Sequence, residues 1–390
     1  MSVSWITTGI TEAFLRGVVE CEPTTAGLTP QRLPAWARAQ IPDPQAQRTV
    51  QLSSGVTVTF STRATRLQLV TRAEKNSADE PWKPEPVYDV YIDGELLTQR
   101  VSEVQPDGTA VLHLEGLPQR NKVVELWLPY DELTVLLAVR SDAKVVPVAE
   151  ESRPLWLHHG SSISHGSDAV GASHTWVGTA ARAAGVELLN LGFAGNAMLD
   201  QFTARTIRDT CADVISCKLG INVVNGDTHR LRSFVPALHG FIDTIREGHP
   251  DTQLLIISPL WCGIHESTPG PVAWDVVEEN GVRRQKFWST GDPQEIQYGR
   301  LSLEVVREQM AAVLSQRMQT DPLLHYMNGL QLYSESDARQ FPMPDDLHPG
   351  PAAHQLIGER FAQLVFGSDG VFSAASGSEQ ELSHQRQRDQ

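Results

Sequence analysis

The 390-residue sequence is short of cysteine, of basic charge and of long apolar runs. Its four cysteines, Cys21, Cys211, Cys217 and Cys262, have neither CxxC spacing nor the density of a disulfide scaffold, which indicates reduced, structural thiols. Lysine and arginine number 32 against 47 acidic residues, so the net charge of −15 provides no basic footprint for nucleic acid or an anionic membrane. No apolar run approaches the roughly 18 residues that a membrane span requires.

What remains is the composition of an ordinary globular protein, with 41% apolar and 20% charged residues. The length exceeds that of a usual single domain and predicts two of them. The first residues, "MSVSWITTGITEAFLRG", lack the basic start and apolar core of a secretion signal, so we expect a cytoplasmic protein.

The first part of the chain has the period of β-strands. In "GVTVTFST" the apolar side chains alternate at Val56, Val58 and Phe60, as they do in a half-buried strand. "VYDVYIDGELL" places Asp93 and Gly94 between two short apolar stretches, a strong hairpin signal because both residue types tolerate positive φ. Residues 1–150 are therefore predicted to form an all-β sandwich, jelly-roll-like and similar in kind to carbohydrate-binding domains.

Beyond residue 150 short apolar runs alternate with helical ones. "LWLHH" precedes "HTWVGTAARAAG", "VELLNLG" precedes "LDQFTARTIRDT", and further pairs follow. Repeated strand-then-helix units indicate a parallel sheet covered on both faces by right-handed crossovers, so residues 151–370 are predicted to form an α/β domain. Residues 371–390 are polar and poor in aromatic side chains, which predicts a disordered tail.

Polar residues that suit acyl transfer follow the ends of these predicted strands. The segments are "HHGSSISHG", "LGFAGNAM" and "LGINVVNGD", and "PMPDDLHPG" precedes the final helix. Ligands of such sheets bind beyond the carboxyl ends of the strands, so these segments are expected to meet at one edge. A hydroxyl nucleophile needs a base, the base needs an orienting group, and the oxyanion needs N–H donors; these segments offer all of them.

At this point the sequence resembles the SGNH (GDSL-type) hydrolase superfamily, with four blocks in the family's order. "GSSISHG" is similar to the family's first block, which implies Ser162 as nucleophile. "LGFAGNAM" and "LGIN" resemble the second and third blocks; the backbone N–H groups of Ser162 and Gly195 and the side-chain amide of Asn222 would form the oxyanion hole. "DDLHP" resembles the fifth block and implies His348 as base and Asp345 as its orienting acid.

The resemblance covers residues 155 to about 366 and implies a three-layer α/β/α sandwich with a flavodoxin-like parallel sheet. Two positions depart from the family pattern: Ser161 stands where the family has an aspartate before the nucleophile, and Val223 where it has one after the third-block asparagine. Neither position carries the attacking or proton-shuttling role, so the departures bear on the substrate. A β domain in front of such a catalytic domain resembles a two-domain bacterial subgroup that includes esterases and acyltransferases that tailor aromatic polyketides.

Neighbouring residues leave alternatives open at three of these positions. The competitors are Ser161 and Ser164 for the nucleophile, Asp346 for the orienting acid and Gly192 for the oxyanion glycine. The block pattern selects among them; the spacing of the residues does not. Ser162 could also act only as the cap of the following helix, because hydroxyls favour that position.

The three histidines of the first block, together with Asp345 and His348, invite a metal hypothesis, which we set aside because a strand and turn do not provide convergent ligands. His158 and His159 are adjacent and would point to opposite faces of a strand. We expect one of the two to be buried and hydrogen-bonded, and we expect no metal. His165, three residues past Ser162, is a candidate for substrate contact.

A long segment at residues 260–299 is richer in aromatic residues than an ordinary connection. Two interpretations stay open: a packed surface excursion, or a lid or wall that offers a flat apolar face to substrate through Trp261, Trp274 and Trp288.

The sequence thus predicts a serine-dependent acyl-transfer enzyme without a cofactor. The first hypothesis is an acyltransferase that moves an acyl group, salicylyl-like where the resemblance holds, from a CoA-type thioester to a hydroxyl of a small natural product. An esterase with the same catalytic residues is the second hypothesis, and a binding protein with a decayed catalytic domain is the third. No nucleic-acid or membrane partner is expected, and the oligomeric state stays open.

Overall fold

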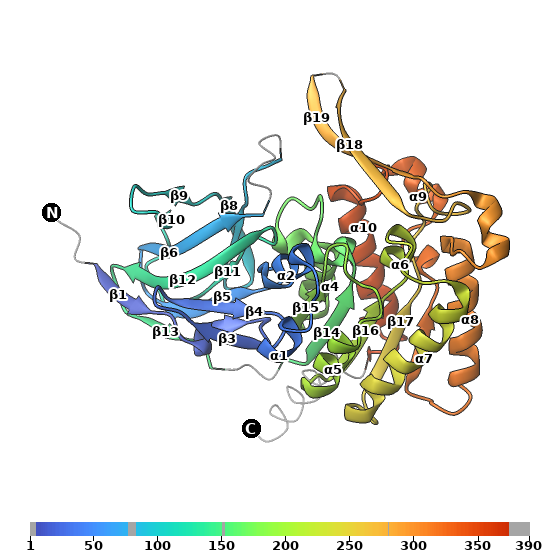
Figure 1. The fold of residues 1–390 in the computed structure, drawn as a ribbon. Helices are drawn as coiled ribbons and strands as arrows, with labels where there is room; N and C mark the ends of the chain where they lie inside the picture. Colours follow the sequence, from blue (N-terminus) through green and yellow to red (C-terminus); the bar gives the residue numbers. More distant parts are fainter. Residues whose placement is uncertain (1–4, 77–82, 150–152, 280, 374–390) are drawn as a thin grey trace. The chain divides into compact units, whose positions relative to one another are not determined.

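The computed structural model describes residues 5–76, 83–149, 153–279 and 281–373 (Figure 1). The chain divides into two compact units: unit 1 comprises Met1–Ser152 with Val170–Ser173, and unit 2 comprises Arg153–Ala169 with His174–Gln390. The segment Val170–Ser173 groups with unit 1 because Ser173 N donates to Asp89 Oδ2 at 2.8 Å. No helix in the described part of the chain combines the length and the apolar character needed to cross a membrane.

Unit 1 contains two antiparallel sheets. The first has the order β3-β4-β12-β6-β10-β9 with β1 on β12, and the second has the order β13-β5-β11-β7-β8 with β2 on β5. The strands of the first sheet are β1 Ile6–Gly9, β3 Glu20–Pro23, β4 Leu28–Gln31, β6 Arg66–Lys75, β9 Glu103–Val104, β10 Ala110–Glu115 and β12 Glu132–Ser141. Those of the second are β2 Leu15–Arg16, β5 Thr57–Thr62, β7 Tyr88–Ile92, β8 Glu95–Arg100, β11 Lys122–Trp127 and β13 Val145–Pro147. Three helical segments accompany them: η1 Glu12–Phe14, α1 Ala35–Arg38 and α2 Pro44–Gln51.

The apolar side chains of both sheets share one core. Val58 and Phe60 of β5 are fully buried in it together with Leu67 and Leu69 of β6, which confirms the predicted alternation. The hairpin predicted at Asp93 is also present: β7 pairs with β8, and Asp93 and Gly94 have φ of 51° and 86°.

Glu132 is an acid buried in unit 1, and it makes the stability of the protein depend on pH. Its Oε1 accepts hydrogen bonds from Tyr88 and Thr134, each at 3.0 Å, yet burial outweighs them and raises the pKa of the carboxyl from 4.5 to about 7. Because the folded-state pKa lies above that of the unfolded chain, the contribution of Glu132 to stability is fully present below about pH 4.5 and is lost as the pH rises through about 7.

Glu132→Gln is expected to remove most of this dependence, because glutamine cannot ionise. Wild-type protein should lose on the order of 3 kcal/mol of unfolding free energy between pH 5 and pH 8 relative to the variant. Urea unfolding at both pH values measures the difference, with Glu115→Gln on an exposed position of β10 as the matched control. Equal pH dependence in wild type and Glu132→Gln would contradict the assignment.

Unit 2 is built on one parallel sheet of order β15-β14-β16-β17-β20. Its strands are β14 Leu155–Gly160, β15 Glu187–Gly192, β16 Val214–Lys218, β17 Gln253–Ile257 and β20 Leu324–Met327, and a separate hairpin comprises β18 Val272–Glu279 and β19 Val282–Ser289. The helices are α3 Ser162–His165, α4 Trp176–Ala184, α5 Gln201–Asp209, α6 Ile221–Asn225, α7 Leu231–Gly248, α8 Leu303–Arg317, α9 Glu335–Gln340 and α10 Pro351–Phe361. Short helical turns are η3 Pro293–Tyr298, η4 Gly329–Gln331 and η5 Ala362–Phe366, while η2 Ala172–His174 begins in the segment that groups with unit 1. In chain order the strands run 2-1-3-4-5, the flavodoxin-like arrangement.

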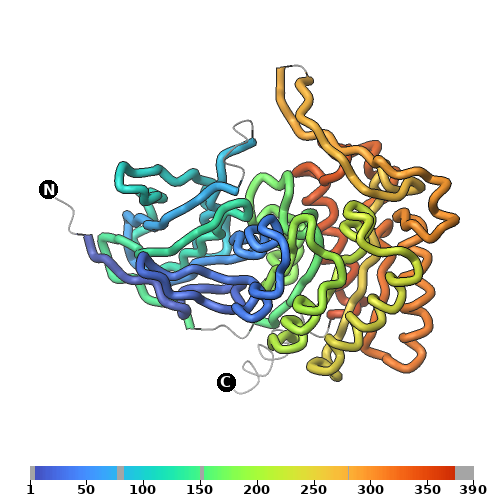
Figure 2. Tube along the Cα trace, in the orientation of Figure 1, coloured from blue at the N-terminus to red at the C-terminus, as the bar shows by residue number. Residues whose placement is uncertain are grey.

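Helices cover both faces of this sheet, as predicted. On one face Trp156 of β14 packs against Trp176 of α4 and Phe361 of α10, with ring centroids 6.1 and 5.0 Å away. On the other face His159 stacks on Phe241 of α7 at 5.9 Å. The last helix α10 returns to pack beside α4, the first long helix of the unit (Figure 2). Unit 2 is therefore a three-layer α/β/α sandwich.

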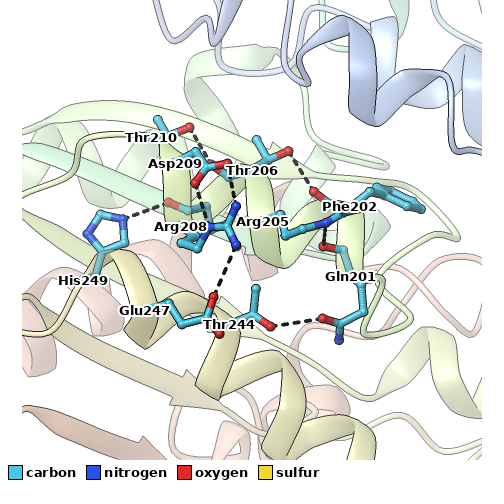
Figure 3. A network of polar contacts seen from close by, with 11 residues as sticks. Gln201, Phe202, Arg205, Thr206, Arg208, Asp209, Thr210, Thr244, Glu247 and His249 are labelled. Carbon is cyan, nitrogen blue, oxygen red and sulfur yellow. Dashed lines mark hydrogen bonds and ion pairs between the residues drawn. The ribbon is translucent and has the colours of Figure 1, made fainter.

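Polar contacts join α5 to α7 on the second of these faces (Figure 3). Thr244 Oγ1 donates to Gln201 Oε1 at 3.1 Å, and Arg208 Nη1 donates to Glu247 Oε2 at 3.2 Å. The helices approach so closely that a Cβ at Gly248 would lie 2.1 Å from the Arg208 carbonyl oxygen. These contacts hold α5 against α7 in the helix layer on this face of the sheet.

The end of unit 2 lies further along the chain than predicted. Phe372 belongs to the segment that the sequence assigned to a disordered tail, yet it is 1% exposed and its ring packs on Phe366 with centroids 5.5 Å apart. One aromatic residue thus extends the folded part to at least residue 373. The rest of the predicted tail, residues 374–390, lies outside the described residues.

Candidate active site

The strand order brings two of the predicted residues to the switch point of the sheet. Ser162 follows β14 and Asn222 follows β16, which are neighbours in the sheet although β15 lies between them in the chain. The connection after β14 leads to β15 on one side of it, whereas β16 lies on its other side and its connection leads away to β17. The loops after β14 and β16 therefore diverge and leave room for a ligand.

Each of the three serines of the first block has a different partner. Ser161 is the N-cap of α3 and its Oγ accepts from Ile163 N at 3.4 Å. Ser164 Oγ lies 2.9 Å from Nε2 of His158. Ser162 is the remaining one, and its Oγ lies 2.9 Å from Nε2 of His348. The N-cap of α3, a role that the sequence left open for Ser162, is thus Ser161, the residue that departs from the family pattern.

The short helix α3 packs directly against the ends of β14 and β15, because the last residue of each strand is a glycine. A Cβ at Gly160 would lie 2.4 Å from Ser164 Oγ, and one at Gly192 would lie 2.5 Å from His165 N. No larger residue fits at either position without moving α3. These glycines therefore hold the Ser162 turn directly against the ends of β14 and β15.

Ser162, His348 and Asp345 form a continuous chain of hydrogen bonds. Nδ1 of His348 lies 2.6 Å from Oδ2 of Asp345, while Oδ1 of Asp345 accepts from the backbone N–H groups of Leu347 and His348 at 2.9 and 2.6 Å. The carboxylate fixes the proton on Nδ1 and leaves Nε2 free to accept the hydroxyl proton of Ser162. All three residues are buried, so little water competes for these bonds.

Asp345 is ionised in this arrangement. Its burial acts to raise the pKa of the carboxyl, but the charge of His348 and the hydrogen bonds from His348 and Leu347 outweigh that effect and hold the pKa below its usual value. The competing acid, Asp346, points elsewhere: its Oδ2 accepts from Lys286 Nζ at 3.1 Å. The structure therefore places Asp345, and not Asp346, against His348.

Asn222 presents a buried side-chain amide at the start of α6. Its Oδ1 accepts from Ala197 N at 3.0 Å, which fixes the orientation of the amide. Among the described residues Nδ2 has no hydrogen-bond partner, although the side chain is 1% exposed. A buried amide donor left open in this way is costly unless a ligand oxygen accepts from it.

The two glycines that compete in the second block have different surroundings. The N–H of Gly192 already donates to Asn190 Oδ1 at 2.9 Å. Gly195 lies in the loop after β15, is exposed and has a φ of 75°, a conformation that favours glycine. Gly195 is thus the better placed of the two to offer a backbone N–H to a ligand. Val223, the second departure, is fully buried within α6.

One acid near His348 was missed from the sequence. A carboxylate oxygen of Asp168, one of Asp345 and a ring nitrogen of His348 lie within 4.8 Å of one another, a set that could in principle hold a metal ion. Both ring nitrogens of His348 are engaged by Asp345 and Ser162, so this geometry favours proton transfer over ligation. Asp168 is exposed, has a φ of 66° and lies six residues beyond Ser162, and no local sequence pattern marks it as a neighbour of His348.

Both histidines of β14 are buried, where the sequence predicted burial of one. His158 packs on Trp176 of one face and His159 on Phe241 of the other. Burial lowers the pKa of both rings, that of His159 to about 4, so both are neutral near pH 7. Burial also lowers the pKa of Lys218, the last residue of the neighbouring strand β16, to about 7.

The candidates for substrate contact occupy different settings. His165 is the last residue of α3; it is 3% exposed and its Nδ1 donates to the Gly192 carbonyl at 3.0 Å, at the end of β15. Trp261 N donates to the Tyr333 carbonyl at 3.1 Å. Trp274 and Trp288 are 54% and 43% exposed on the hairpin β18–β19. Their contact with substrate stays a prediction.

The hairpin itself was missed, and the signal for it was in the sequence. The dipeptide Asn280-Gly281 is typical of a two-residue hairpin turn, and Glu279 pairs with Val282 across it. Sequence reasoning instead treated the segment as one long connection, because no apolar alternation marks strands that are half exposed on both faces.

Comparisons with known proteins support this description. The family model "SsfX3, N-terminal domain" matches residues 14–137. The structure is similar to that of the salicylyl-acyltransferase SsfX3 from a tetracycline biosynthetic pathway, with 28% identity, a TM-score of 0.76, and coverage of 91% of this chain and 95% of that one. A comparison with curated protein sequences gives no match.

More distant structures share the fold. A GDSL-like lipase from Bacteroides ovatus has 18% identity and a TM-score of 0.68, covering 92% of this chain and 96% of that one. A family two carbohydrate esterase from Clostridium thermocellum has 13% identity and a TM-score of 0.55, covering 80% and 91%. The N-terminal unit is similar to the SsfX3 N-terminal domain over residues 14–137, and the two units share the fold of these acyltransferase, lipase and esterase structures.

Proposed function

We propose that the protein is an acyltransferase that forms an acyl-Ser162 intermediate and passes the acyl group to the hydroxyl of a small molecule. The observation that carries this proposal is the chain of hydrogen bonds from Ser162 through His348 to Asp345. The Asn222 amide supports it: Asn222 follows β16, the neighbour of β14 in the sheet, and its Nδ2 has no hydrogen-bond partner among the described residues. Together these groups would provide a nucleophile, a base with a fixed tautomer and an oxyanion donor.

The reaction runs in two steps. In the first, Nε2 of His348 takes the proton of Ser162, whose Oγ attacks the carbonyl carbon of the acyl donor. The N–H groups of Ser162 and Gly195 and the amide of Asn222 donate to the oxyanion. His348 then protonates the leaving group, which for a CoA-type thioester is the thiol.

In the second step the acceptor hydroxyl attacks the acyl-serine. Its oxygen forms the new bond to the acyl carbon, its proton passes to Nε2 of His348, and the bond from the acyl carbon to Oγ breaks as His348 returns a proton to Ser162. The charge of Asp345 stabilises the imidazolium in both steps. No metal or organic cofactor is required, and the donor and the acceptor are the partners that the proposal needs.

Ester hydrolysis is the second candidate, because water in place of the alcohol completes the same cycle. The names of the lipase and the esterase among the structural neighbours favour it, and the 28% identity to a salicylyl-acyltransferase favours transfer. A decayed binding protein is the weakest candidate, since a site without catalysis has no reason to keep an open, buried amide at Asn222.

Product analysis tests the proposal. The protein is incubated with an N-acetylcysteamine thioester and a panel of alcohols, and the products are identified by mass spectrometry. We expect an ester in the presence of a suitable alcohol, and an acyl mass on the peptide that contains Ser162 when the acceptor is withheld. Free acid alone with every alcohol would support the esterase, and the absence of any acyl-enzyme would contradict both candidates.

A further inference from the structure

The hairpin β18–β19 is joined at its base to the loop that carries Asp345 and His348. Its strands pair from Val272 opposite Ser289 to Glu279 opposite Val282, and the hairpin extends away from the other elements of unit 2 (Figure 1). Phe287 N donates to the Asp345 carbonyl at 3.0 Å, and the neighbouring Lys286 forms its ion pair with Asp346. The hairpin is thus fixed where the general base is held.

Phe287 brings an apolar surface directly to that base. Its ring lies edge-on to the His348 ring, with centroids 5.4 Å apart and an interplanar angle of 83°. An aromatic ring in this position covers one side of the imidazole. The hairpin therefore borders the site on the side of the His348 ring.

The strand register separates the two exposed tryptophans of the hairpin. Trp274 lies directly opposite Phe287, and cross-strand partners project from the same face of a hairpin. The N–H of Phe287 is directed to Asp345 and away from β18, so this is a non-hydrogen-bonded pair, the kind in which the two chains lie closest. Trp288 pairs with Ala273 and projects from the opposite face.

The chemistry of His348 shows which part of a substrate meets this face. The base protonates the leaving group in the first step and deprotonates the acceptor in the second, so both occupy the side of the site next to its ring. The oxyanion donors of the other loops take the carbonyl oxygen. A surface that continues from His348 through Phe287 to Trp274 therefore borders the leaving group and the acceptor.

We propose that the face of the hairpin formed by Phe287 and Trp274 is the acceptor wall, and that it selects alcohols with a flat apolar body. The inference rests on the proposed function and names the class of acceptor. Trp274 is 54% exposed, which leaves its indole available to cover such a body. An acceptor held there displaces water from the neighbourhood of Nε2 and shifts the acyl-enzyme from hydrolysis to transfer.

The test measures how the acyl-enzyme divides between two products. Benzoyl N-acetylcysteamine is supplied with 2-naphthylmethanol or with ethanol, and the ratio of ester to free acid is determined by mass spectrometry. Since both products come from the same intermediate, the ratio does not depend on the amount of folded enzyme. Trp274→Ala is expected to lower the ratio about 10-fold with 2-naphthylmethanol and to leave the ratio with ethanol much closer to that of wild type. Trp274→Phe should restore most of the loss.

Two further variants make the test specific. Trp288→Ala should lower the 2-naphthylmethanol ratio less than Trp274→Ala, because its indole projects from the other face. Tyr298→Ala, which removes a 77% exposed ring elsewhere in the same insert, is the control for loss of an aromatic side chain. The acceptor wall is disproved if Trp274→Ala keeps the wild-type ratio with 2-naphthylmethanol, or if Trp288→Ala lowers that ratio as much as Trp274→Ala does. It is also disproved if the wild-type enzyme gives no naphthylmethyl ester. The proposed function fails separately, when no acyl-Ser162 forms.

Discussion

Ser162→Ala is expected to lower turnover of a small activated aryl ester by at least about 10,000-fold, the order of loss that follows removal of a serine nucleophile. The reason is that no other hydroxyl of the first block reaches the base: Ser162 Oγ lies 2.9 Å from Nε2 of His348, while Ser161 and Ser164 are engaged by Ile163 N and His158. The initial rate of nitrophenol release from nitrophenyl acetate measures the effect.

Ser161→Ala is the matched control, because it makes the same change at the adjacent residue. It removes the cap of α3 and is expected to lower stability by about 1 kcal/mol while turnover stays within a few-fold of wild type. A comparable loss of turnover in both variants would assign the effect to the structure of α3. Turnover retained by Ser162→Ala would exclude Ser162 as the nucleophile.

Asp345→Asn is expected to lower kcat about 10,000-fold with little change in KM, as in serine proteases that lose the orienting acid. Asparagine keeps the shape of the side chain, but its N–H₂ group cannot accept the proton of His348 Nδ1, and the imidazole then presents the wrong nitrogen to Ser162. The loss of the carboxylate charge also removes the stabilisation of the imidazolium. Steady-state kinetics on the same ester separate kcat from KM.

Asp346→Asn is the adjacent control, and it should keep kcat within a few-fold of wild type. Asp346 has a φ of 72°, which asparagine adopts readily, and its carboxylate contacts only Lys286 among the partners described above. The reverse outcome, a large loss at Asp346 and a small one at Asp345, would exchange the two assignments.

The sheet of unit 2 and its strand-end residues could be predicted because each leaves a local trace in the sequence. Strands buried on both faces read as short apolar runs, and the polar segments after Gly160 and Lys218 can be located from the ends of those runs. The choice of Ser162 within its segment, and its pairing with His348, came from the order of four blocks and not from the local pattern. The choice of Asp345 over Asp346 came from the same blocks, since spacing treats adjacent acids alike, and the hydrogen bond from His348 to Asp345 agrees with it.

The parts that were missed share a physical origin in exposure or in non-local contact. The strands of the hairpin are half exposed on both faces, so no apolar alternation distinguishes Val272–Glu279 from a loop. Asp168 comes near His348 only through the turn after α3, and Phe372 is buried only because η5 provides a surface for its ring. The polar composition of residues 371–390 predicted a disordered tail, because a single buried aromatic residue, Phe372, hardly changes that composition.

Asp345 and His348 are three residues apart, whereas Ser162 and His348 are separated by 186. The acid–base pair can therefore form within one turn while the rest of the chain is still loose, but the nucleophile meets the base only when the first and last segments of unit 2 have docked. Recovered turnover during refolding consequently reports the latest and most distant contact of the unit, and a spectroscopic signal from the local turn would rise before it.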